Sequence, residues 1–310
     1  MKALHRGPAS DRRLHLMTVV TATDGRGLAV EQCGAPGGRP VFLLHGTPGS
    51  RLGPIPRPMV LYQLGIRLIS FDRAGYGLSD RSFGRTVADI AADVRAIADF
   101  LGLEEFAVLG RSGGGPHALA CAALLPERAR RVAALVALAP AQAEGLDWFE
   151  GMAVSNTRQY LAARGQGRLI SARLRSAADG IRADPARYLA EIHAELTRSD
   201  RRVVADAGMR RMLYETFAEA FRRSADGWID DLLAFSRPWG FDPGDIGVPT
   251  MLWHGADDTF SPAGHSRWLA GRIRTSTVVI QSDSAHFGAF DVIPDMLAWL
   301  AEAVQPSQRL

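Results

Sequence analysis

Apolar positions follow two different periods in the first half of this chain. Short apolar runs closed by glycine- or proline-rich turns alternate with stretches in which apolar residues recur every three or four positions. Val87, Ile90, Val94, Ile97 and Leu101, for example, would share one face of a helix. The pattern predicts strands at 17–22, 27–33, 39–44, 66–71, 106–109 and 132–139, and helices at 59–64, 86–101 and 116–125.

The alternation stops near residue 144. Residues 144–236 have helical patterns without a clear strand, and strands are again predicted at 250–253 and 277–280, with helices at 261–273 and 294–304. Strands that alternate with helices form a mostly parallel sheet covered on both faces. We therefore predict an α/β fold with a core of residues 17–143 and 237–310, a helical cap of residues 144–236, and a flexible N-terminal tail of residues 1–16.

Composition and charge narrow the class of protein. The chain is 47% hydrophobic and carries a formal net charge of +3, which is ordinary for a globular protein. Lys2 is the only lysine, and the arginines are mixed with acidic residues along the whole chain instead of forming a basic stripe. This distribution argues against a nucleic-acid partner.

Three further features bear on the compartment. Residues 1–16 have no apolar core of a secretory signal, and no apolar run reaches the roughly 18 residues that a membrane span needs. Cys33 and Cys121 are far apart and suggest no disulfide framework. We expect a cytoplasmic monomer or homodimer that acts on a small-molecule substrate and has no membrane partner.

The segment Gly110-Arg111-Ser112-Gly113-Gly114 carries the first candidate chemistry. It follows an apolar run and opens a helix, so it has the form of G-x-S-x-G at a strand-to-helix turn. Such a turn exposes the serine hydroxyl at the rim of a sheet, and the glycines leave room for the bend. The backbone N–H of Gly113 would then point at the oxygen of a bound carbonyl. Ser112 is therefore a candidate nucleophile.

A serine nucleophile needs a base, and the base needs an orienting acid. His286 is the best candidate base, because it follows the last predicted strand in a loop that can reach the sheet edge. Asp257 and Asp258 follow the strand at 250–253 in the same way. We expect His45 to hydrogen-bond within its own loop.

The remaining histidines beyond the N-terminal stretch fit the role of the base less well. His117 lies on the helix after the serine and would point along it. His254 would be buried at a strand end. We expect His193 and His265 to lie on helix surfaces.

Together these segments give the chain a resemblance to the α/β-hydrolase-fold serine hydrolases with a helical cap. The similarity extends from about residue 27 to 303 and has the chain order Ser, Asp, His of that fold. The segments that carry it are 45–49 (His-Gly-Thr-Pro-Gly), 72–79 (Asp-Arg-Ala-Gly-Tyr-Gly-Leu-Ser), 110–114, 255–258 (Gly-Ala-Asp-Asp) and His286.

The resemblance implies a role for each of these segments. Ser112 would be the nucleophile, and His286 the general base and then the general acid. The third residue after the glycine of the G-x-x-D segment, Asp258, would be the catalytic acid. The oxyanion hole would use the backbone N–H groups of Thr47 and Gly113.

Two alternatives for the acid stay open. Asp257 is the second choice beside Asp258, and Asp147 is a third, because some members of the family place the acid after the preceding strand. Branches of this fold that open epoxides or remove halogens carry an aspartate nucleophile, and Ser112 argues against that chemistry.

Arg111 is a large charged residue in a crowded turn, and it has two interpretations. The first is a structural ion pair beside the turn. The second is contact with a polar or anionic group of the substrate.

The predicted cap is rich in apolar and aromatic residues, which favours a hydrophobic or aromatic acyl group. Its aromatic residues and methionines include Trp148, Phe149, Met152, Tyr160, Tyr188, Met209, Met212, Tyr214, Phe217, Phe221 and Trp228. Proline iminopeptidases of similar architecture need cap carboxylates to hold a free amino terminus. Glu191, Glu195, Glu215 and Glu219 have the i, i+4 spacing of exposed helix faces, which argues against that activity.

We therefore predict a serine esterase or thioesterase without a cofactor, which cleaves a hydrophobic or aromatic acyl substrate through an acyl-enzyme on Ser112. A C–C bond hydrolase of the same fold, or a non-hydrolytic binder or cyclase in a natural-product pathway, is the alternative. No metal is expected, because the sequence has neither H-E-x-x-H nor C-x-x-C.

Overall fold

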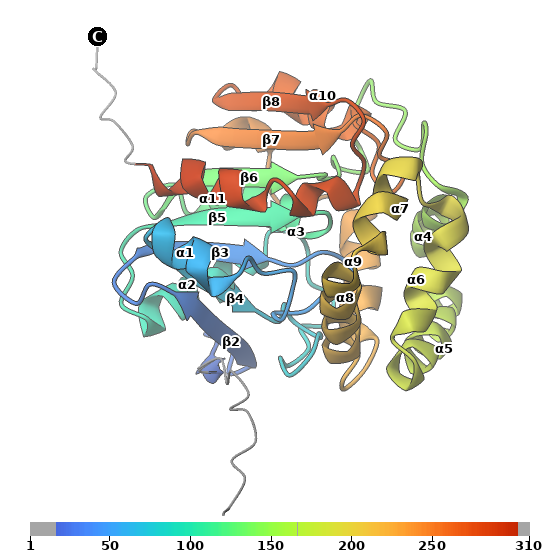
Figure 1. The fold of residues 1–310 in the computed structure, drawn as a ribbon, viewed down its shortest axis with the longest axis horizontal. Coiled ribbons are helices and arrows are strands. Elements are labelled where there is room, and N and C mark those ends of the chain that lie inside the picture. Colours follow the sequence, from blue (N-terminus) through green and yellow to red (C-terminus); the bar gives the residue numbers. More distant parts are fainter. Residues whose placement is uncertain (1–16, 166, 303–310) are drawn as a thin grey trace, which may run out of the picture.

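The architecture is a twisted eight-stranded sheet with helices on both faces (Figure 1). It is seen in a computed structural model that describes residues 17–165 and 167–302. The strand order is β1-β2-β4-β3-β5-β6-β7-β8. The strands are β1 (Thr18–Thr21), β2 (Gly27–Gly34), β3 (Arg39–Leu44), β4 (Ile66–Phe71), β5 (Phe106–Arg111), β6 (Ala129–Leu135), β7 (Thr250–Gly255) and β8 (Ser276–Gln281).

The sheet is parallel from β4 to β8 and antiparallel at its first edge. β1 pairs with β2, and β2 with β4, in antiparallel register, whereas every neighbouring pair from β4 to β8 is parallel. The predicted α/β fold class, a mostly parallel sheet covered on both faces, is confirmed. The carboxyl ends of the parallel strands therefore meet at one edge, where the loops carry the candidate residues.

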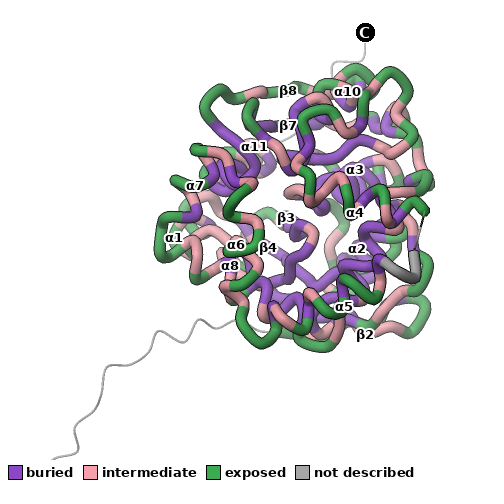
Figure 2. Tube along the Cα trace, turned by 90° about the vertical axis from the view of Figure 1, so that its right-hand side faces the viewer, coloured by how far each residue is buried: buried purple, intermediate pink, exposed green. Residues whose placement is uncertain are grey.

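Helices lie on both faces of the sheet, while the edge strand β8 stays mostly exposed (Figure 1). The helices α1 (Pro58–Gln63) and α11 (Ile293–Ala301) lie on one face. The opposite face packs against α2 (Ile90–Phe100), α3 (Gly114–Leu124) and α10 (Gly264–Arg272). Figure 2 shows buried chain at the centre of the molecule and exposed chain on its outer turns, including the edge strand β8.

Among the described residues between β6 and β7 the regular elements are helices: the short 3₁₀ helix η2 (Pro243–Asp245) directly precedes β7, and the others lie beyond the carboxyl ends of the parallel strands (Figure 1). They are α4 (Val154–Gly165), α5 (Gly167–Ala183), α6 (Ala186–Ile192), the short 3₁₀ helix η1 (His193–Glu195), α7 (Arg198–Ala205), α8 (Ala207–Ala220) and α9 (Asp226–Phe235). The candidate residues at the ends of the strands thus face the helical segment α4–α9. Among the described helices, none combines the length and the apolar character that spanning a bilayer would need.

Most predicted elements differ from the structure by three residues or fewer at each end, and two differ by four residues at one end. The helix predicted from residue 86 begins at Ile90, because the Asp89 carboxylate accepts hydrogen bonds from the N–H (2.6 Å) and hydroxyl (3.0 Å) of Thr86 and closes a turn there. The strand predicted to reach residue 139 ends at Leu135, because Val136 takes a left-handed conformation (φ 45°) that turns the chain out of the sheet. The predicted tail 1–16 and the predicted helix end at 304 lie outside the described residues.

Candidate active site

Ser112 lies on a tight turn between β5 and α3. Its φ of 53° is left-handed, its N–H donates to the Leu135 carbonyl (2.8 Å), and its carbonyl accepts from the N–H of Gly115 (2.8 Å). A Cβ on Gly114 would stand 2.1 Å from the Leu44 carbonyl oxygen, so only glycine allows α3 to start this close to β3. The backbone therefore presents the serine at the carboxyl edge of the sheet, as the sequence pattern requires.

Ser112, His286 and Asp258 form one hydrogen-bonded chain, although they come from three separate loops. His286 Nε2 lies 3.0 Å from Ser112 Oγ, and His286 Nδ1 lies 2.8 Å from Asp258 Oδ2. An ionised carboxylate only accepts hydrogen bonds, so Nδ1 carries the proton and Nε2 accepts from the serine hydroxyl. This is the arrangement that a histidine base needs in order to take a proton from serine.

Asp258 is buried and held in the ionised state. Its Oδ1 accepts from the N–H groups of Phe260 (2.8 Å) and Ser261 (3.1 Å). Burial favours the neutral acid, but the nearby imidazoles of His286 and His254 outweigh it and lower the pKa of Asp258 well below its usual range. The carboxylate therefore stays charged at neutral pH and can stabilise an imidazolium at His286.

The two alternative acids lie elsewhere. Asp257 is exposed, and its carboxylate accepts a long hydrogen bond (3.5 Å) from Ser199 Oγ. Asp147 is also exposed and accepts from the N–H of Phe149 (3.2 Å). Within the described part of the chain, neither carboxylate forms a hydrogen bond or ion pair with His286.

Thr47 and Gly113 lie against each other beside the serine. A Cβ on Gly113 would stand 2.1 Å from Thr47 Oγ1 and 3.2 Å from the Thr47 nitrogen. Neither backbone N–H donates a hydrogen bond within residues 17–165 and 167–302. Helix α3 begins at Gly114, and its N-terminus favours negative charge next to Gly113. The pair is therefore suited to stabilise an oxyanion formed on a carbonyl attacked by Ser112.

A buried ion cluster connects the loop of Thr47 to helix α9 of the helical segment. Asp231 of α9 is fully buried and accepts from Arg73 Nη1 (2.6 Å) and Nη2 (2.7 Å), from Arg85 (2.6 Å) and from the Tyr76 hydroxyl (2.8 Å). The hydroxyl of Thr47 also donates to its carboxylate. Although burial opposes ionisation, Arg73 and Arg85 lower the pKa of Asp231 well below its usual range.

We expect Asp231→Ala to destabilise the fold by about 3–5 kcal/mol, because it leaves two buried guanidinium groups without their carboxylate. Urea unfolding of the purified protein measures this loss. The neighbouring Asp230→Ala is the matched control, since Asp230 pairs with the partly exposed Arg81, and its loss should be about 1 kcal/mol. Equal losses of unfolding free energy in the two variants would contradict the larger contribution expected from the Asp231 cluster.

The Asp231 cluster also predicts how the stability of the fold changes with pH. Because the folded pKa of Asp231 is depressed, its charge stabilises the fold above the unfolded pKa of about 3.9, and this stability is lost as the pH falls through the folded value. The stability difference between the wild type and Asp231→Asn should therefore be full at pH 7 and narrow below about pH 4. A difference that stays constant down to acid unfolding would contradict this expectation.

A cavity of about 900 Å³, part of it open to solvent, lies over the serine. Ser112, His286, Thr47 and Gly113 are at its base. The helical segment supplies much of its wall, with apolar side chains and the polar residues Asn156, Gln159 and Thr216, and Leu138 and Phe260 line it from the sheet side. The wall residues from the helical segment include Tyr160, Tyr188, Ile192, Leu213, Phe217, Trp228 and Leu232.

Predictions about four of the other histidines can be compared with the structure. His45 Nδ1 lies 2.8 Å from the Gly46 carbonyl, so it does bind within its loop, and His254 is buried at the end of β7. The prediction that His265 lies on a helix surface is wrong. The ring is buried against Trp148 and accepts from the N–H of Ala139 (3.1 Å), and burial lowers its pKa to about 4. His193 is exposed, as predicted.

The interpretation of the four glutamates as exposed helix residues holds for two of them. Glu191 and Glu215 are exposed and pair with arginines of their own helices. Glu195 is half-buried and accepts from the N–H of Ser155 (3.0 Å) on α4. Glu219 is buried instead, because it pairs with Arg51 (2.5 Å) at the contact between α8 and a core loop.

Several supporting residues were not predicted from the sequence. Asp231 is one of two adjacent acids inside the apolar stretch 228–235, which is the only local signal for it. Asp200 of α7 is buried and accepts from the N–H of Phe287 (2.7 Å), so it holds the chain next to His286. Nothing in its local sequence marks this role. His254 likewise supports Asp258, with Nε2 3.3 Å from Oδ2.

Comparison with known proteins agrees with this arrangement. Residues 39–291 match the family described as the alpha/beta hydrolase fold, which is most of the chain. The chain belongs to this family. The resemblance predicted from the five sequence segments is therefore confirmed, and with it membership in a family of hydrolases.

Individual relatives differ in name. A non-heme haloperoxidase from Rhodococcus erythropolis is 26% identical over 81% of this chain and 85% of its own length. A proline iminopeptidase from Xylella fastidiosa is 34% identical, but the match covers only 36% of each chain. Among solved structures, an esterase from Exiguobacterium antarcticum superimposes with a TM-score of 0.66 over 93% of this chain and all of its own, at 22% identity. That last likeness shows the fold.

The described residues contain no group of three or more histidine, cysteine, aspartate or glutamate side chains placed to hold a metal ion.

Proposed function

We propose that this protein is a serine hydrolase that cleaves a carboxylic ester or thioester through an acyl-enzyme on Ser112. The observation that carries the proposal is the unbroken hydrogen-bonded chain from Ser112 through His286 to Asp258 at the base of the cavity. Each member has the neighbour that its role requires.

The reaction follows from the geometry. Ser112 Oγ attacks the carbonyl carbon while His286 Nε2 takes the hydroxyl proton, and Asp258 stabilises the resulting imidazolium. The carbonyl oxygen becomes an oxyanion between the N–H groups of Thr47 and Gly113. The alcohol or thiol leaves with the proton from His286. Water then attacks the acyl-enzyme by the same steps and releases the carboxylic acid and the free serine.

The substrate class follows from the cavity walls. We propose that the helical segment α4–α9 acts as a cap, since it supplies most of the apolar wall over Ser112. Aromatic side chains such as Tyr160, Phe217 and Trp228 favour a hydrophobic or aromatic acyl group. No aspartate or glutamate is found among the described residues that line the cavity, so a free amino terminus would have no carboxylate partner there.

A panel of acyl esters tests this proposal. We would measure kcat/KM for 4-nitrophenyl acetate, butanoate, hexanoate and phenylacetate, and for the matching thioesters of a common thiol. Because each buried methylene contributes about 0.8 kcal/mol, kcat/KM should rise by about tenfold or more from acetate to the larger acyl groups. A preference for acetate, or no hydrolysis of any ester, would contradict the proposed substrate class.

A further inference from the structure

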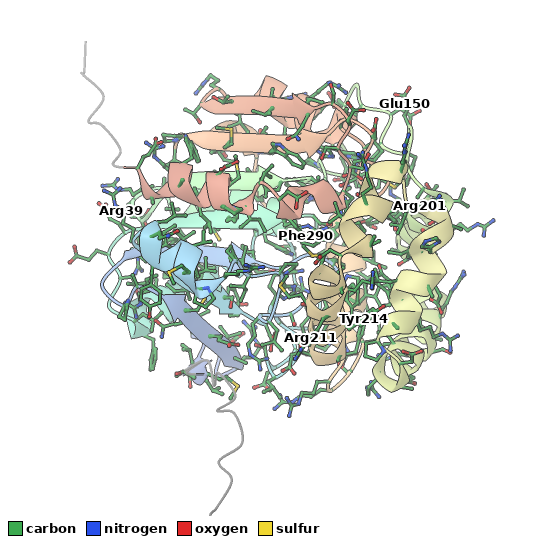
Figure 3. All side chains as sticks on the ribbon, viewed as in Figure 1. Arg39, Glu150, Arg201, Arg211, Tyr214 and Phe290 are labelled. Atoms are coloured by element: carbon green, nitrogen blue, oxygen red, sulfur yellow. The ribbon has the colours of Figure 1, made fainter. Side chains whose placement is uncertain are left out.

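The last residue of β5, Arg111, lies beside the nucleophile in an unusual setting for an arginine. Its guanidinium stacks on the ring of Phe290, 3.9 Å from the centroid, with Phe287 further away at 5.4 Å. Nη2 makes one long hydrogen bond (3.4 Å) to the His286 carbonyl. Figure 3 labels Phe290 near the centre of the molecule, where the sheet meets the helical segment. Arg111 thus lies between the loop that carries His286 and the cavity.

The half-buried Arg111 lacks the carboxylate partner that the buried arginines have. Arg51, Arg73 and Arg85 each contact a carboxylate within 2.6 Å. Within the described residues no carboxylate lies within ion-pair distance of Arg111, and its buried Nε has no hydrogen-bond partner. The ion pair considered in the sequence analysis is therefore not found there. Burial lowers the pKa of Arg111 to about 10, and Asp258 and Asp200 offset this only partly, from beyond contact distance.

The guanidinium is also close to the reacting centre. Arg111 Nη1 and Ser112 Cβ each lie 3.4 Å from the point where a Cβ on Gly46 would stand, so both flank the same glycine. Arg111 lines the cavity, and among the described lining residues it is the only arginine, with no lysine present. A guanidinium without a carboxylate partner, at a cavity wall that also carries aromatic side chains, is well suited to bind a carboxylate of a ligand, since arginine offers two parallel N–H donors.

We propose that Arg111 binds a carboxylate of the substrate, so that the natural substrate is an ester or thioester with an apolar body and a carboxylate a few bonds from the reacting carbonyl. This inference rests on the proposed hydrolase function and narrows it. A purely structural role is the competing explanation, in which Arg111 only holds the Phe287–Phe290 segment and hence His286. The two explanations differ in whether the loss of kcat/KM caused by replacing Arg111 depends on the charge of the substrate.

Matched ester pairs separate them. The monoethyl esters of succinic, glutaric and adipic acid each carry a carboxylate where ethyl butanoate, pentanoate and hexanoate end in a methyl group. We would measure kcat/KM for all six by proton release, with the wild type, Arg111→Gln and Arg111→Lys. The exposed Arg130, which pairs with Glu105, gives the control variant Arg130→Gln.

The wild type should prefer the anionic ester at one chain length at least. Arg111→Gln should lower kcat/KM for that ester at least tenfold and change the neutral partner less than threefold, because a hydrogen bond to a charged group is lost only with the anion. Arg111→Lys should recover part of the loss, and Arg130→Gln should change neither ester.

Two results would overturn the inference. One is a wild type that prefers the neutral ester at all three lengths, a measurement that does not depend on the folding of any variant. The other is an equal loss on both members of each pair in Arg111→Gln, which would assign Arg111 to positioning His286. Failure of the hydrolase proposal is distinguishable, because the wild type would then cleave none of the six esters.

Discussion

Replacing Ser112 with alanine should lower kcat for the best ester by about 10⁶-fold, with no loss of fold stability. Loss of the nucleophile removes the acyl-enzyme route, and in the best-studied serine hydrolases it costs about as much as removing the whole triad. The residual rate would come from substrate binding and the oxyanion site formed by Thr47 and Gly113. Initial rates at high enzyme concentration, with an active-site titration of the wild type, measure the ratio.

The expected loss is specific because alanine fits the Ser112 position. The turn is fixed by the backbone and by Gly114, and removing the hydroxyl leaves only His286 Nε2 without its partner. Thermal unfolding should therefore change little between the wild type and Ser112→Ala. A variant that keeps more than about a hundredth of the wild-type kcat would assign the nucleophile elsewhere, since an intact triad contributes far more than that.

Asp258→Asn should lower kcat by about 10⁴-fold, because an amide at this position favours the wrong tautomer of the histidine base. The amide oxygen can still accept from Phe260 and Ser261, so the loop between β7 and α10 should keep its shape. The measurement is the full dependence of rate on substrate concentration, which should show the loss in kcat with KM nearly unchanged.

The adjacent Asp257→Asn is the matched control for this experiment. Asp257 is exposed and only reaches Ser199 on α7 through a long hydrogen bond (3.5 Å), so the variant should retain nearly full activity. A large loss in Asp257→Asn with a small loss in Asp258→Asn would reverse the assignment of the acid and contradict the geometry at His286.

Much of the candidate site could be predicted from the sequence because its residues follow their strands directly. Ser112 directly follows β5, and Asp258 and His286 lie in the loops after β7 and β8. These strands are parallel, so their carboxyl ends meet at one edge of the sheet. Turn chemistry and strand periodicity are local properties, so they can be read without knowing the fold. Their catalytic roles stay predictions until the variants are measured.

The supporting contacts could not be predicted, because they join segments far apart in the chain. Asp231 lies 158 residues from Arg73, and Glu219 lies 168 residues from Arg51. Helical periodicity places Glu219 on a polar face, but it does not show which surface of the core that face meets. The burial of His265 has the same origin, since its ring packs against Trp148, which lies in the loop before α4.

The central claim is that Ser112 is an activated nucleophile, and covalent labelling tests it most directly. Wild type, Ser112→Ala and Asp257→Asn would be incubated with a fluorophosphonate probe and their intact masses measured. We predict a single adduct on the wild type and on Asp257→Asn, and none on Ser112→Ala. A folded wild type that takes no label, or a Ser112→Ala variant that takes the same label, would contradict the proposed mechanism.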